Sequence, residues 1–347
     1  MKKKIIYKLS LLLLLVLGLN VIYNFTLFEN DLRNFSKEDI EIKNTQAKTD
    51  IYYFGESSNV TYKKSDSTQN SISELCSLFF PKLKVTNINK YATHAGVYMH
   101  WLKQINTKLH KPKAIIITMN LRSFDATWIH SKLETQLQQA MVLSQPYPNI
   151  INRFLLSLQA FDNKTEEQRE KEIIQEWKTV KLKWPKAFKF QTVKQWDDAM
   201  ANGGHLDKSG NWDIKKIELA CHFIKGYAFN LNEENPRIRD FDQITNWCQK
   251  NQIKLYFNLM AENIEYADSL VGKELVFLMR ENRDYLKARY SKNNCVLVDN
   301  LELLKGKEFI DQDWTTEHYI DKGRMRIAKI LSEQLKTQFK SEYIKAY

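Results

Sequence analysis

Short apolar runs alternate with amphipathic segments along most of this chain. The strand-like runs lie at residues 51–54, 84–91, 112–119, 253–260 and 295–299. Segments between them carry apolar residues three and four positions apart, a spacing typical of helices. A continuous run such as PKAIIITM is typical of a strand buried on both faces. The order βαβαβ, an interruption, then αβαβα predicts an α/β fold with one parallel sheet of about five strands.

Residues 131–236 form the interruption. Their segment TEEQREKEIIQEWKTVKLKWPKAFKF carries charges of both signs at helical spacing, which is typical of a solvated helix pair. The block is too long for an ordinary loop, so we expect a helical insertion or cap. Because it begins after the third strand, it should lie over the carboxyl rim of the sheet. The sheet domain is then expected in two parts, residues 50–130 and 237–347.

The N-terminal segment is predicted to attach the chain to a membrane. A basic tail, residues 1–8, precedes residues 9–28, which carry no charge and match the length of about 20 residues that a spanning helix needs. The positive-inside rule leaves the tail in the cytoplasm and the body outside it, in the periplasm or on the cell surface of a bacterium. A cleaved signal peptide is the alternative, although no small-x-small site follows; a buried core helix is another. Residues 29–49 are polar and are expected to be a linker.

Composition excludes several classes of function. The formal net charge of +11 in 347 residues comes partly from the N-terminal tail, and the rest is spread along the chain. No arginine-rich stripe interleaved with aromatic residues is present, so we expect no nucleic-acid partner. The four cysteines have no metal-ligand spacing; buried free thiols are the default expectation, and pairing outside the cytoplasm is the alternative. Neither a Walker motif nor G-x-G-x-x-G occurs, so neither a cofactor nor a metal is expected.

Four loops carry residues suited to acyl transfer. GESSN, after the first strand, holds Ser57; YATHAGVY, after the second, holds Gly96; TMNLRSF, after the third, holds Asn120. The last, FIDQDWTTEHYIDKGR, holds His318 before the terminal helix. Open α/β sheets bind their ligands at the carboxyl ends of the strands. These residues are therefore candidates for one shared site.

This order of residues resembles the SGNH (GDSL-type) hydrolase superfamily. Ser57 in GESS matches its Gly-Asp-Ser block, with Glu56 in place of Asp, and Gly96, Asn120 and His318 match its later blocks. The match covers the two parts of the sheet domain. The resemblance implies a three-layer, flavodoxin-like fold. It points in particular to a membrane-anchored, extracytoplasmic branch that includes proteins of cell-wall and exopolysaccharide acylation, which work beside membrane-bound O-acyltransferases.

The roles that the resemblance implies agree with acyl-transfer chemistry. A serine hydroxyl such as that of Ser57 needs an adjacent base, normally histidine, to become a nucleophile. The oxyanion that forms can be stabilised by the N–H groups of Ser57 and Gly96 and by the amide of Asn120. Ser58 is expected to make only local hydrogen bonds.

One position departs from the family pattern. The family has an aspartate three residues before the histidine, where this chain has Thr315. Asp313 is the favoured carboxylate to orient His318. The other candidate, Glu317, directly precedes His318 in the chain, and the side chains of adjacent residues usually point apart. A Ser-His dyad without a carboxylate is the alternative.

Three further residues are candidates for substrate binding. Arg122 follows Asn120 and can hold an anionic group bidentately, or it can form a structural ion pair. Asn258 and Glu262, in NLMAEN after the fourth strand, should lie on the pocket rim, or they belong only to a turn.

The sequence therefore predicts an extracytoplasmic, membrane-anchored serine esterase or O-acyltransferase. Its substrate would be a carbohydrate or cell-envelope polymer, and a membrane-bound O-acyltransferase is an implied partner. Hydrolysis and transfer use the same acyl-enzyme and differ in the acceptor, so both stay open. The alternative is a non-catalytic envelope assembly or scaffold protein that retains the fold, which Glu56 and the incomplete Asp-x-x-His pattern favour.

Overall fold

Five parallel strands form one sheet in the order β2-β1-β3-β4-β5. The strands are β1 (Ile51–Gly55), β2 (Val85–Asn89), β3 (Ala114–Met119), β4 (Lys254–Leu259) and β5 (Cys295–Asp299). This computed structural model describes residues 2–292 and 294–345. The prediction of an α/β fold with a parallel sheet is confirmed. The strand order reverses between β1 and β3, and ligands of open α/β sheets bind at such a reversal.

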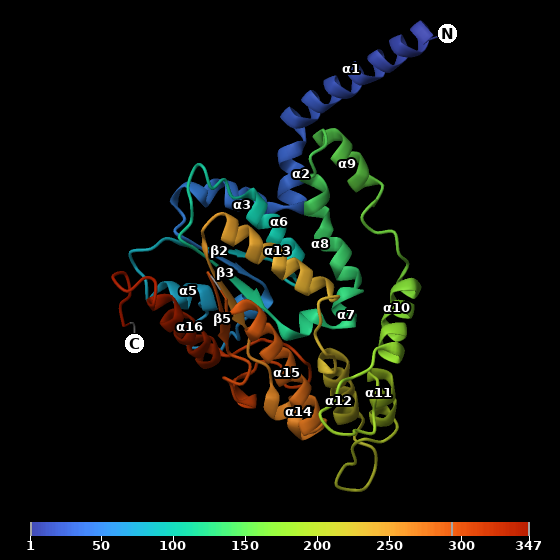
Figure 1. Ribbon diagram of the computed structural model, residues 1–347, viewed down its shortest axis with the longest axis vertical. Helices are drawn as coiled ribbons and strands as arrows, with labels where there is room; N and C mark the ends of the chain where they lie inside the picture. The colour runs from blue at the N-terminus through green and yellow to red at the C-terminus, as the bar shows by residue number, and fades with distance from the viewer. Residues whose placement is uncertain (1, 293, 346–347) are drawn as a thin grey trace.

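Helices cover both faces of the sheet (Figure 1). Alternate residues of a strand point to opposite faces, so Tyr52 and Phe54 of β1 belong to one core and Ile51 and Tyr53 to the other. The first core also contains residues of α6 (Ala95–Gln104), α13 (Pro236–Lys250) and α15 (Lys273–Tyr290). The second contains residues of α5 (Ile72–Ser77) and α16 (Asp321–Lys336). Burial on both faces explains why the strands read as continuous apolar runs.

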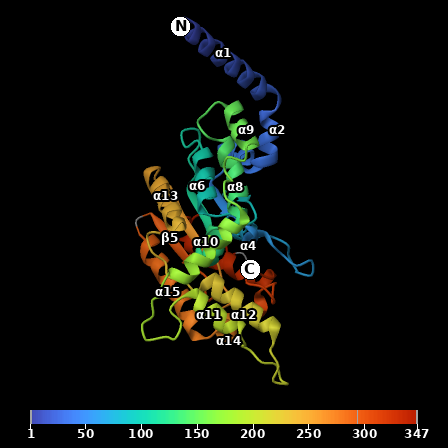
Figure 2. The same cartoon turned by 90° about the vertical axis from the view of Figure 1, so that its right-hand side faces the viewer.

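The chain between β3 and β4 is largely helical, as expected for the interruption. It contains η2 (Leu121–Phe124), α7 (Ala126–Ile129), α8 (Lys132–Leu143), α9 (Asn149–Ser157), α10 (Glu166–Thr179), α11 (Val193–Ala201), α12 (Ile214–Tyr227) and α13. These helices do not form one cap. Figures 1 and 2 show α8 and α9 running toward the N-terminal helix, whereas α11 and α12 lie at the opposite end of the molecule beside α14 (Ile264–Leu270).

The N-terminal helix α1 (Lys2–Thr26) projects from the body (Figure 1). Among the described residues it is the one helix long and apolar enough to span a membrane. The linker expected after it is instead helical, as α2 (Phe28–Phe35), α3 (Lys37–Thr45) and η1 (Gln46–Lys48). Ile42 of α3 enters the first core, and Asp39 binds His100 Nε2 at 2.9 Å. Both contacts join segments far apart in sequence. The polar composition of residues 29–49 therefore could not show that this segment is ordered.

Candidate functional site

Polar residues from three separate loops meet at the carboxyl edge of the sheet. Glu56 directly follows β1, Asn120 directly follows β3, and Glu317 lies between β5 and α16. The Asn120 amide donates to Glu56 Oε1 and, at 3.4 Å, to Glu317 Oε2. Ser57 and His318 are the chain neighbours of these two glutamates. The predicted nucleophile, amide donor and base are therefore held at one edge.

The carboxylate beside His318 is Asp311, which replaces the predicted Asp313. His318 Nδ1 lies 2.8 Å from Asp311 Oδ2, and the Thr316 hydroxyl donates to the same oxygen. The loop folds back on itself, because the Ile310 N–H donates to the His318 carbonyl at 2.8 Å. That antiparallel turn brings Asp311 opposite the imidazole. Counting residues back from the histidine could not find it.

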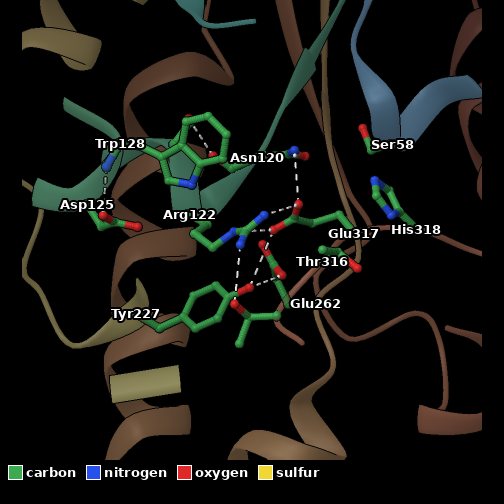
Figure 3. Close-up of polar contacts among 12 residues, drawn as sticks. Ser58, Asn120, Arg122, Asp125, Trp128, Tyr227, Glu262, Thr316, Glu317 and His318 are labelled. Atoms are coloured by element: carbon green, nitrogen blue, oxygen red, sulfur yellow. Dashed lines mark hydrogen bonds and ion pairs between the residues drawn. The ribbon is translucent and has the colours of Figure 1, made fainter. Parts of the chain in front are cut away.

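The two adjacent serines differ in their surroundings. Ser57 is the first residue of the short helix α4 (Ser57–Val60) and is half-buried. Ser58 is buried, and its hydroxyl donates to Glu56 Oε1 at 3.4 Å. In Figure 3 the imidazole of His318 points toward α4, where Ser58 is drawn. No hydrogen bond joins either hydroxyl to His318 among the residues that the structure describes, so the choice of Ser57 as nucleophile stays a prediction.

Arg122 is engaged by protein carboxylates. Its Nε and one terminal nitrogen donate to the two oxygens of Glu317 at 3.1 and 3.2 Å (Figure 3). Its other terminal nitrogen donates to Thr315 Oγ1 at 3.2 Å. Tyr227, from α12 of the insertion, donates to Glu262 at 2.5 Å and to Glu317 at 3.5 Å. The structural ion pair, rather than a free anion-binding arginine, is the arrangement seen here.

Burial raises the pKa of several carboxyl groups in this cluster. Burial and then the charge of Glu317 raise the pKa of Glu56 to about 8. The same two causes raise the pKa of Glu262, and burial raises that of Asp125 to about 7. Burial alone would lower the pKa of Arg122, but Glu317 and other nearby acidic groups raise it. At neutral pH the cluster therefore holds Arg122 charged while Glu56 keeps its proton.

Two of the three predicted oxyanion donors are already hydrogen-bonded. The Gly96 N–H donates to His94 Nδ1 at 3.1 Å. A Cβ on Gly96 would lie 2.9 Å from His94 Cε1, so a larger residue here would force the His94 ring to shift. The Asn120 amide donates to Glu56 and Glu317, as described above. An acyl oxygen could use the Asn120 amide only by replacing Glu56 or Glu317 as its acceptor.

The expectation that Asn258 lies on the pocket rim is wrong. Asn258 is fully buried; its amide donates to the Tyr53 hydroxyl at 3.1 Å, and its oxygen accepts from Asn300 at 2.8 Å. Glu262 is also buried and is bonded to Tyr227, so it belongs to the cluster around Arg122 rather than to an open rim. Asn258 lies within β4, on the same face as Tyr256, where the second core covers it. Its hydrogen-bond partners come from β1 and from the loop after β5.

A cavity of about 640 Å³ borders the loop that carries His318. It lies between α12, α14 and residues 312–314, and Trp314, Tyr266 and Lys216 contribute to its wall. Trp314 is 48% exposed, and its ring lies 3.9 Å from that of His222. Asp313 also lines this cavity. Sequence reasoning missed Trp314, because a tryptophan in a loop can equally be a packed structural residue or part of a binding surface.

Comparison with known proteins adds no family to these observations. Neither a scan against protein-family models nor a search of curated proteins finds a match to this chain. Within the described residues, no group of three His, Cys, Asp or Glu side chains is placed to hold a metal ion, and the four cysteines are free and buried. The chemistry must therefore be argued from the cluster itself.

Proposed function

We propose that this chain is a membrane-anchored, extracytoplasmic serine esterase or O-acyltransferase of the SGNH type. One observation carries the proposal: Glu56 and Glu317, the neighbours of Ser57 and His318, share the amide of Asn120 at the carboxyl edge of the sheet. The order of these residues along the chain is that of the superfamily. The α/β sheet and the apolar helix α1 agree with its anchored branch.

The pairing of His318 Nδ1 with Asp311 leaves Nε2 for the nucleophile. In the proposed reaction Nε2 accepts the proton of Ser57 as Oγ attacks the acyl carbonyl, and Asp311 stabilises the imidazolium. The proton then passes to the leaving oxygen, which gives an acyl-enzyme. Water or a sugar hydroxyl attacks this intermediate and restores Ser57, so hydrolysis and transfer differ only in that acceptor.

A carbohydrate or cell-envelope polymer is the proposed substrate. The cavity beside the His318 loop combines the exposed face of Trp314 with polar side chains, and an aromatic body with polar neighbours suits a ring that is apolar on one face and hydroxylated at its edge. A membrane-bound O-acyltransferase is the partner proposed to hand on the acyl group.

The second candidate is a non-catalytic envelope assembly protein that keeps this fold. The engaged Asn120 amide favours it, because a hydrogen bond to the buried Glu56 fills the position where an oxyanion donor should be free. A working site would need this amide released when substrate binds.

Labelling with a fluorophosphonate separates the two candidates. The full chain in detergent is expected to be labelled, and Ser57→Ala should abolish the label, because removing a triad nucleophile can cost about 10⁶-fold in kcat. Ser58→Ala is the matched control and should keep the label. Labelling that survives Ser57→Ala but not Ser58→Ala would move the nucleophile by one residue. No labelling of the folded wild type would favour the assembly protein.

A further inference from the structure

Helix α9 buries Leu156 and a polar residue on its inner side and exposes large apolar side chains on its outer side. Its central residue Asn152 is fully buried, and its amide donates to the carbonyls of Leu143 and Gln145 at 3.1 and 2.9 Å. Phe154 and Leu158, four positions apart, are 59% and 61% exposed. Residues at this spacing share one face of a helix. The outward face of α9 is therefore apolar.

This apolar face lies beside the end of the N-terminal helix. Figures 1 and 2 both show α9 next to the junction of α1 and α2. The Asn149 amide donates to Asn24 Oδ1 at 2.9 Å, and the Ile150 N–H donates to Asn20 Oδ1 at 3.0 Å. Further exposed apolar side chains surround the junction, namely Phe25, Leu27 and Tyr147. Exposed apolar side chains of α9 and of the end of α1 therefore lie on neighbouring helices.

Polar contacts join α9 to α1 and α2. Arg153 of α9 pairs with Asp31 of α2 at 3.0 Å, and the Tyr23 hydroxyl of α1 donates to the same carboxylate at 2.7 Å. Asp31 is buried between them. A single carboxylate therefore links α1, α2 and α9, and the position of α9 follows that of the anchor.

We propose that α9 is a second membrane contact, whose apolar face lies in the lipid interface beside the span; this rests on the proposed membrane anchor. The basic tail, residues 2–8, belongs to α1 but stays outside the lipid, so the predicted span is residues 9–28, about 30 Å of helix for a hydrocarbon core of about 30 Å. Asn24 and Asn20 therefore lie about 6 and 12 Å below the outer boundary with the headgroups. Interfacial helices bury their apolar face about 5–10 Å into that boundary, which matches the depth of these turns.

The position of α9 at the membrane also determines how far the candidate site lies from the bilayer. α7 begins at Ala126, six residues after Asn120, and α8 connects α7 to α9 (Figure 1). The 12 residues of α8 span about 18 Å. The site therefore lies about one helix length from α9, at the end of α8 away from the anchor.

Fluorescence quenching by lipids tests the contact in the full chain. An environment-sensitive dye is attached to the cysteine of Phe154→Cys. The labelled protein is reconstituted in nanodiscs of phosphatidylcholine and phosphatidylglycerol, in which some lipids carry a nitroxide on the acyl chain. Leu13→Cys, within α1, is the control for the span. Leu206→Cys, in the loop between α11 and α12 at the opposite end of the molecule, is the matched exposed control. The native cysteines are buried and should add little label.

Nitroxide lipids should quench the dye at position 154 about as strongly as at position 13 and leave position 206 unchanged. Quenching at 13 without quenching at 154 would overturn the contact of α9 while the anchor stands, and would assign its apolar face to a protein partner. No quenching at either position would refute the anchor itself.

Discussion

Replacing Glu56 by glutamine is expected to change how the stability of this protein depends on pH. The pKa of Glu56 is raised from 4.5 to about 8, first by burial and then by the charge of Glu317. Between these values the unfolded chain has lost a proton that the folded chain keeps. The free energy of unfolding of the wild type should therefore fall as pH rises through this window, by about 1.4 kcal/mol per pH unit for this one group.

The glutamine side chain has no proton to lose but can still accept the hydrogen bond from Asn120 through its carbonyl oxygen. The stability of Glu56→Gln relative to the wild type should thus increase by roughly 3 kcal/mol between pH 5 and pH 7. Other buried carboxyl groups, such as Glu262 and Asp125, are present in both proteins. The contribution of Asp125 therefore cancels in the difference, whereas Glu262 can add to it above the pKa of Glu56, because the charge of Glu56 also raises the pKa of Glu262.

Urea unfolding of the full chain in detergent measures this difference, with the fluorescence of its eight tryptophans as the signal. Glu333→Gln, at an exposed position of α16, is the control and should not change the pH profile of the wild type. Parallel profiles for Glu56→Gln and the wild type would show that Glu56 is ionised in the folded protein. The reasoning from burial would then be wrong.

Three further outcomes are expected. Asp311→Asn should lower turnover of a small acyl ester by about 10⁴-fold, by analogy with the aspartate of a serine protease triad. Asp313→Asn should leave turnover of the same small ester near wild type, because Asp313 lines the proposed polymer cavity and is not the carboxylate bonded to His318; the reverse result would restore Asp313 as the orienting carboxylate. Arg122→Met should lower the free energy of unfolding by about 3–5 kcal/mol, because Glu317 loses its buried partner, against about 1 kcal/mol or less for the exposed Arg280→Met; equal losses would contradict the buried pair. A reporter fused to the C-terminus should be active only if it works outside the cytoplasm, and activity of a cytoplasmic reporter would invert the proposed topology.

The sheet and the loops that bear the site could be predicted because their signals are local. An apolar run such as residues 114–119 must be buried on both faces, whatever covers it. The residues after each run then lie at the carboxyl edge, which is how Ser57 and Asn120 were predicted to share one site before any contact was known. The uncharged stretch of α1 is equally local, since its length and composition alone make it long enough to span a membrane.

What only the tertiary structure decided were pairings between distant segments. Asp311 reaches His318 through a turn of the backbone, and Tyr227 reaches Glu262 from the insertion. The outward apolar face of α9 likewise depends on which side of the helix α8 covers. Apolar periodicity reports whether a side chain is buried, but not which partner it meets. Hydrogen bonds and ion pairs depend on that partner to within an ångström, so they follow from packing and not from spacing along the chain.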